Sequence, residues 1–159
     1  MKSIATDAPV LVIGYGNVLR GDDGAGWVAA RRLARRLPRR LASVLMVHQL
    51  LPELAEPISR AKRAIFIDAD ERLAPGQVCQ KIVEPLDRAD GTIGHHQSPE
   101  GLLRLARDLY GRAPEALVFS IGAAGFEFRP TLSTPVRRAL PGLLQSVADA
   151  VQDVELCHA

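Results

Sequence analysis

Two adjacent carboxylates, Asp22 and Asp23, follow a glycine-rich segment near the start of the chain. They come after an apolar run that ends at Gly14-Tyr15-Gly16, a pattern with which many dinucleotide-binding folds begin. The third glycine of that fingerprint would fall at position 19, which is leucine. A phosphate-binding loop presents bare N–H groups to an anion, whereas two carboxylates repel phosphate and attract cations. The sequence therefore predicts a site for a metal ion or a proton, not for a phosphate group.

Two further polar groups follow other apolar segments. Asp68 ends the run Ile65-Phe66-Ile67, with Asp70 and Glu71 close behind, and the pair His95-His96 precedes a predicted helix. Two carboxylates and one imidazole could hold a divalent ion such as nickel or zinc and leave positions open for water or substrate. Without a metal, the same groups would suit acid–base chemistry.

Each of these residues also has a simpler interpretation. Asp22 or Asp23 could cap the helix that follows, because acids are favourable at a helix N-terminus. The histidine pair could be a surface feature of a Gly/Thr-rich loop. Only the joint placement of the three groups favours a functional site.

The elements that must position these groups alternate along the chain. Apolar runs predict strands at 8–13, 42–47, 64–68 and 116–121, and a further strand at 77–83 follows the Pro75-Gly76 turn. Helical spacing and N-terminal signals predict helices at 24–37, 53–59, 99–110 and 133–154. This order predicts a single α/β domain over residues 1–159, with a doubly wound, mostly parallel five-stranded sheet and helices on both faces. Ligands of such sheets bind at the carboxyl ends of the strands. We therefore expect all three polar groups at that edge, the histidines after the fourth strand.

Composition limits the possible partners and compartment. The 159 residues carry a formal charge of +2, with six arginines between positions 31 and 40. No aromatic residues lie among them, so a solvated basic helix face is favoured over a nucleic-acid surface.

Cys79 and Cys157 have no metal-ligand spacing, and we expect neither a signal peptide nor a membrane segment and hence a cytoplasmic protein. Trp27 lies at an apolar position of the first helix, and we expect it in the core.

The glycine-rich segment resembles a known family signature. Residues 14–26 match Gly-x-Gly-Asn-x-Leu-x-x-Asp-(Asp or Glu)-(Gly or Ala)-x-Gly, which is typical of the hydrogenase maturation proteases. The resemblance covers nearly the whole chain, because further blocks match in order at 49–55, 65–69, 95–103 and 132–136.

The resemblance implies an endopeptidase that removes the C-terminal extension of a nickel-iron hydrogenase large-subunit precursor after nickel insertion. It implies Asp23, Asp68 and His95 as the catalytic and metal-contacting residues. We prefer His95 to His96 because this choice places Ser98 at the family's small-residue position. Nickel would be carried by the precursor, and we expect no organic cofactor, no nucleic-acid or membrane partner, and a monomer.

Other functions stay open from the sequence. A noncatalytic nickel-checking chaperone of hydrogenase assembly could use the same three residues, and a nucleotide or flavin binder or a peptidase with a resident metal are further alternatives. A covalent nucleophile is disfavoured, because the chain has no Gly-x-Ser-x-Gly elbow and neither cysteine has an evident base partner. Residues 49–53 depart from the Gly-Thr-x-Gly turn of some relatives, a difference expected to affect substrate choice.

Overall fold

The computed structural model describes residues 7–87 and 98–157. Five strands form one sheet in the order β2-β1-β3-β5-β4. The strands are β1 (Val10–Tyr15), β2 (Ala42–Val47), β3 (Arg63–Asp70), β4 (Val78–Val83) and β5 (Glu115–Gly122). Neighbouring strands are parallel except for β4, which pairs antiparallel with β5.

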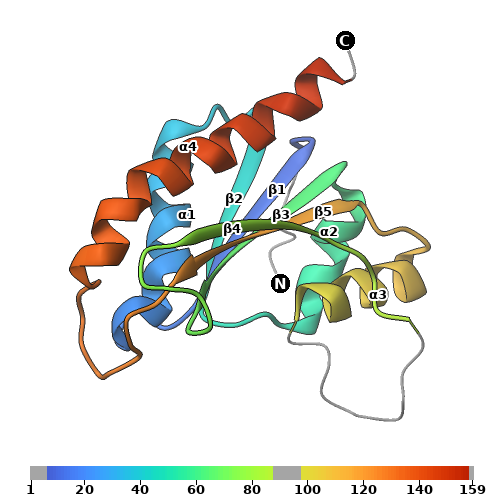
Figure 1. Cartoon of the computed structure of the whole chain (residues 1–159). Helices are drawn as coiled ribbons and strands as arrows, with labels where there is room; N and C mark the ends of the chain where they lie inside the picture. The colour runs from blue at the N-terminus through green and yellow to red at the C-terminus, as the bar shows by residue number, and fades with distance from the viewer. Residues whose placement is uncertain (1–6, 88–97, 158–159) are drawn as a thin grey trace.

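Helices cover both faces of this sheet (Figure 1). Helices α1 and α4 pack on one face, where Phe119 is fully buried, and α2 and α3 pack on the other, over Phe66. The described helices are α1 (Ala25–Arg36), α2 (Ala55–Arg60), α3 (Pro99–Tyr110) and α4 (Thr134–Leu156), with short 3-10 helices η1 (Gly21–Gly24) and η2 (Pro52–Leu54). Among the described residues, no helix is both long and apolar enough to cross a membrane.

The predicted α/β fold is confirmed, but the direction of β4 was not anticipated. Its last residue, Val83, pairs with Ala116 at the amino end of β5, whereas Asp68 lies beside Ser120 near the carboxyl end. The chain therefore leaves β4 at the edge opposite Asp68. The expectation that His95 and His96 lie at the carboxyl edge therefore does not follow from the direction of the strand before them. Both residues lie outside the described part of the chain, so their place stays a prediction.

Two positions of the signature segment, Gly16 and Gly26, leave no room for a side chain. A Cβ at Gly26 would lie 2.2 Å from the Ile67 carbonyl oxygen, so only glycine lets the start of α1 pack directly on the strand ends. Gly16 has a φ of 138°, and a Cβ there would lie 1.8 Å from the Asp23 carbonyl oxygen. These glycines therefore bring the first loop and η1 close against the carboxyl ends of β1 and β3.

The surface of α1 differs in one respect from the prediction. Trp27 is only partly buried, and the Arg31 guanidinium lies 5.9 Å from the centroid of its ring. The expectation that Trp27 belongs to the core was wrong, because helical spacing alone does not tell a core position from the margin of the apolar face. The arginines of α1 are exposed as expected; on the side facing α4, Arg36 donates to Gln145.

Candidate functional site

Asp68 lies near the carboxyl end of β3, between two hydroxyl groups from the neighbouring strands. The Ser120 hydroxyl of β5 donates to Asp68 Oδ1 at 2.6 Å, and the Tyr15 hydroxyl of β1 donates to Asp68 Oδ2 at 3.0 Å. The parallel register explains this arrangement, since Ser120 is the direct partner of Asp68 and Tyr15 follows the partner of Ile67. Two hydroxyls from the adjacent strands therefore fix the plane of the Asp68 carboxylate.

Asp68 forms no salt bridge with a described residue. No lysine or arginine among the described residues lies within 4 Å of it; Lys81 Nζ is instead 3.9 Å from Glu100 Oε1. Burial raises the pKa of Asp68, while the hydrogen bonds from Ser120 and Tyr15 and, to a lesser extent, the charge of Lys81 oppose that rise. A partly buried carboxylate whose hydrogen-bond donors are neutral and which has no salt-bridge partner is a favourable place for a bound cation.

Tyr15 is suited to act as a hydrogen-bond donor to this carboxylate. Burial, and next the charge of Asp68, raise the pKa of the Tyr15 hydroxyl far above its ordinary value. The hydroxyl therefore stays protonated throughout the physiological pH range. Each oxygen of Asp68 accepts one hydroxyl and keeps further lone-pair positions for another ligand.

Asp23 lies in η1, which packs against the end of β3. Its Oδ2 accepts the Asn17 N–H at 2.9 Å, a bond that closes the loop between β1 and η1. The side chain is partly exposed, and no described residue bonds to its other oxygen. The fold thus brings Asp23 and Asp68 to the same edge of the sheet, as the sequence predicted.

Asp22, the neighbouring acid, has a different environment. It is 1% exposed and accepts three hydrogen bonds, from the Ala124 N–H (2.8 Å), the Ser133 N–H (2.7 Å) and the Ser133 hydroxyl (2.7 Å). Neither Asp22 nor Asp23 caps α1, whose N-cap Gly24 has no side-chain bond, so the capping interpretation was wrong. Asp22 instead joins the first loop to the segment that leads into α4.

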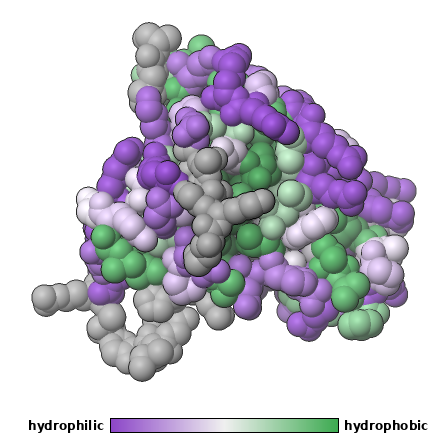
Figure 2. Space-filling view, turned by 180° about the vertical axis from the view of Figure 1, so that it is seen from behind, coloured by the Kyte–Doolittle hydropathy of each residue, from purple (hydrophilic) through white to green (hydrophobic). Residues whose placement is uncertain are grey.

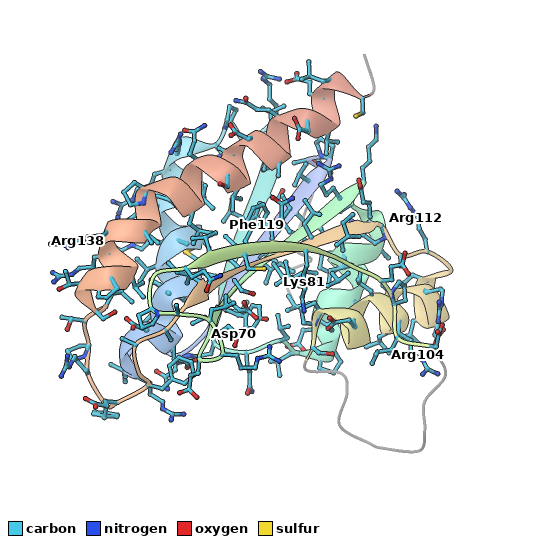
Figure 3. All side chains as sticks on the ribbon, viewed as in Figure 1. Asp70, Lys81, Arg104, Arg112, Phe119 and Arg138 are labelled. Atoms are coloured by element: carbon cyan, nitrogen blue, oxygen red, sulfur yellow. The ribbon has the colours of Figure 1, made fainter. Side chains whose placement is uncertain are left out.

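Asp70, at the end of β3, is a less suitable ligand than Asp68. The Arg72 side chain and backbone donate to Asp70, and these hydrogen bonds lower the pKa of Asp70. Figure 3 shows Asp70 near the ends of the strands, below Lys81 of β4. Because Asp70 is already paired with a cation, it is a weaker ligand candidate than Asp68.

The third predicted site residue, His95, and its neighbour His96 lie outside the described residues. Within residues 7–87 and 98–157, no group of three or more His, Cys, Asp or Glu side chains is arranged to hold a metal ion. Sequence reasoning missed Tyr15 and Ser120. A signal for both was present, since each places a hydroxyl within or at the end of an apolar run of its strand.

Solved structures of hydrogenase maturation proteases are similar to this chain, whereas sequence comparisons find no match. No protein-family model matches the chain, and no curated protein matches its sequence. The [NiFe] hydrogenase maturation protease HybD from Thermococcus kodakarensis is similar over 89% of this chain and 98% of its own, with 25% identity and a TM-score of 0.67. The hydrogenase maturating endopeptidase HybD from E. coli is similar over 91% and 93% of the two chains, with 22% identity and a TM-score of 0.67.

A third similar structure is the [NiFe] hydrogenase maturation protease HycI from Thermococcus kodakarensis KOD1. It aligns with 91% of this chain and 93% of its own at 16% identity, with a TM-score of 0.69. The chain thus matches several hydrogenase maturation proteases in structure over about nine-tenths of its length, at low sequence identity. This similarity confirms the fold that the signature segment implied.

Proposed function

We propose that this chain is a hydrogenase maturation endopeptidase that removes the C-terminal extension of a nickel-iron hydrogenase large-subunit precursor after nickel insertion. The observation that carries the proposal is Asp68, a partly buried carboxylate that two neutral hydroxyls hold and that forms no salt bridge with a described residue. Its position at the ligand-binding edge of a sheet with the fold of these proteases supports the assignment.

In this proposal the nickel belongs to the substrate. Asp23 and Asp68 would supply carboxylate oxygens to it, and His95 would supply an imidazole nitrogen, a donor set that suits a borderline divalent ion. An open-coordinated cation polarises a carbonyl or acidifies a water, and a carboxylate can accept the released proton. Cleavage would then depend on metal loading, because the enzyme engages its substrate through the substrate's metal.

The loop after β1 argues against the nucleotide-binding alternative. The N–H groups of residues 19–23, which a phosphate-binding loop would leave free, all donate to acceptors within the protein. Leu19 donates to Asn17 Oδ1, Gly21 to the Arg129 carbonyl and Asp22 to the Gly125 carbonyl. A phosphate would have to break these bonds before it could bind there.

Separate substitutions of the site residues test the proposal and its main alternative. Asp23→Asn, Asp68→Asn, His95→Ala and His96→Ala variants would each be incubated with nickel-loaded precursor, with truncation and complex formation both recorded. We expect the first three to lose truncation and His96→Ala to keep it. Normal truncation by Asp68→Asn would contradict the assignment. A wild-type protein that forms a nickel-dependent complex without truncation would favour the noncatalytic chaperone.

A further inference from the structure

Two large apolar side chains are exposed on adjoining loops beside the candidate site. Leu19, in the loop after β1, is 49% exposed, and Phe128, in the loop after β5, is 85% exposed. In Figure 1 these loops, blue and orange, lie side by side at the lower left. We call Leu19, Arg20, Phe128 and Arg129 the two-loop platform.

Backbone hydrogen bonds hold the two loops together. The Arg129 N–H donates to the Leu19 carbonyl at 2.9 Å, and the Gly21 N–H donates to the Arg129 carbonyl at 2.7 Å. These bonds form a parallel bridge between Arg20 and Arg129. Beneath the bridge, Asp22 binds Ala124 and Ser133 and so joins the same two loops again. The exposed side chains therefore project from a fixed backbone, which lowers the entropic cost of binding a partner.

The same loop connects the platform to the candidate site. The Leu19 N–H donates to Asn17 Oδ1 at 2.9 Å, and the Asn17 N–H donates to Asp23 Oδ2 at 2.9 Å. Asn17 is thus bonded both to Leu19 and to Asp23. A protein whose bound metal approaches Asp23 would meet the platform beside it.

Charge around the platform indicates what it would bind. Arg20 and Arg129 are both exposed and flank the apolar side chains. Arg129 has a distant acid partner in Glu127, at 3.5 Å, while no acid in the described residues lies within 4 Å of Arg20. Figure 2 shows hydrophobic side chains at the lower right, the end where these loops lie, bordered by hydrophilic ones. An apolar centre with a basic rim complements an apolar surface with an acidic rim.

We propose that the two-loop platform is the docking surface for the folded precursor protein, through an apolar patch bordered by acidic side chains. This inference rests on the proposed function, since it assigns the partner of the same site. Phe128 and Leu19 would act as anchors that become buried in the complex, and Arg20 would speed the encounter of the two proteins.

Steady-state cleavage of nickel-loaded precursor, with direct binding measured in parallel, tests the inference. The variants are Leu19→Ser and Phe128→Ser, with Ile82→Ser as the matched control, because Ile82 is 71% exposed on β4, outside both loops. We expect KM and Kd for the precursor to rise about tenfold or more in the platform variants, with kcat unchanged. Arg20→Glu should slow association several-fold at low salt and much less at 0.5 M salt.

The possible outcomes separate the platform from the proposed function. Cleavage by wild type with KM equal in Phe128→Ser, Leu19→Ser and Ile82→Ser would overturn the platform and leave the function standing. A wild-type dimer that Phe128→Ser converts to monomer would show that a second copy of the chain covers this surface, which also overturns it. Wild type that neither binds nor cleaves the precursor would remove the proposed function and, with it, this partner.

Discussion

Replacing Asp22 should mainly lower the stability of the fold, whereas replacing Asp23 should mainly abolish activity. Asp22→Ala removes an acceptor that is 1% exposed and leaves two backbone N–H groups and one hydroxyl without their partner. Each hydrogen bond to a carboxylate contributes about 1.5–3 kcal/mol, but the Ser133 hydroxyl can rotate to another acceptor and the cost of burying the acid is recovered. We therefore expect a loss of about 3–5 kcal/mol, a large share of a typical stability of about 5–15 kcal/mol.

Asp23→Ala is the matched control, because it removes a single hydrogen bond from a partly exposed side chain. Its expected cost is about 1 kcal/mol. For a chain of this length, 1 kcal/mol corresponds to about 2–4 °C in Tm, so Asp22→Ala should lower Tm by roughly 6–20 °C and Asp23→Ala by about 2–4 °C.

Thermal and urea denaturation followed by circular dichroism would measure both variants, and precursor truncation would be recorded below their Tm. Asp23→Ala should stay folded and lose truncation. If the two variants were destabilised equally, or if Asp22→Ala cost less than about 1 kcal/mol, the assignment of Asp22 to structure and Asp23 to the site would be refuted.

Three further substitutions probe the carboxylate and the loop. Burial raises the pKa of Asp68 above that in the unfolded chain, so its contribution to stability is present below about pH 4 and is lost as pH rises through the folded-state pKa. Asp68→Asn should therefore be at least as stable as wild type at pH 7, with a smaller advantage at pH 3.5. Urea denaturation at both pH values measures this, and a variant less stable than wild type at pH 7 would contradict it. Tyr15→Phe removes one donor to Asp68, and we expect truncation to slow about tenfold with little change in fold; an unchanged rate would mean that the hydroxyl does not position the carboxylate. Gly16→Ala forces a Cβ toward the Asp23 carbonyl oxygen at a φ of 138° and should cost about 3 kcal/mol or more, so a Tm within 2 °C of wild type would contradict the packing described for the loop.

The sheet and its helices could be predicted because the strands other than β4 are largely apolar runs and the longer helices have an amphipathic pattern. The predicted strand at 42–47 coincides with β2, and the predicted helix at 99–110 coincides with α3, where Ser98 accepts the Gly101 N–H as the N-cap. Strand direction was not readable for β4, because an exposed edge strand has the same local pattern whether it runs parallel or antiparallel to its neighbour.

The candidate site could be predicted only in part, because its details depend on contacts between distant segments. The sequence placed Asp23 and Asp68 after two strands, and topology brought them to one edge. Without the family resemblance, which pointed to Asp23, the roles of Asp22 and Asp23 could not be separated, since Asp22 is distinguished by bonds to Ala124 and Ser133, more than 100 positions away. The hydroxyls of Tyr15 and Ser120 reach Asp68 only through the register of three strands. The part assigned to His95 stays a prediction.

The central claim is that this chain cuts a hydrogenase precursor only after nickel has been inserted. The most direct test is to incubate the purified protein with nickel-loaded and nickel-free large-subunit precursor from the same organism and to measure the mass of the intact products. The account predicts one C-terminal truncation, in the loaded sample alone. Equal truncation of both samples would contradict the nickel requirement, and truncation of neither would contradict the peptidase assignment.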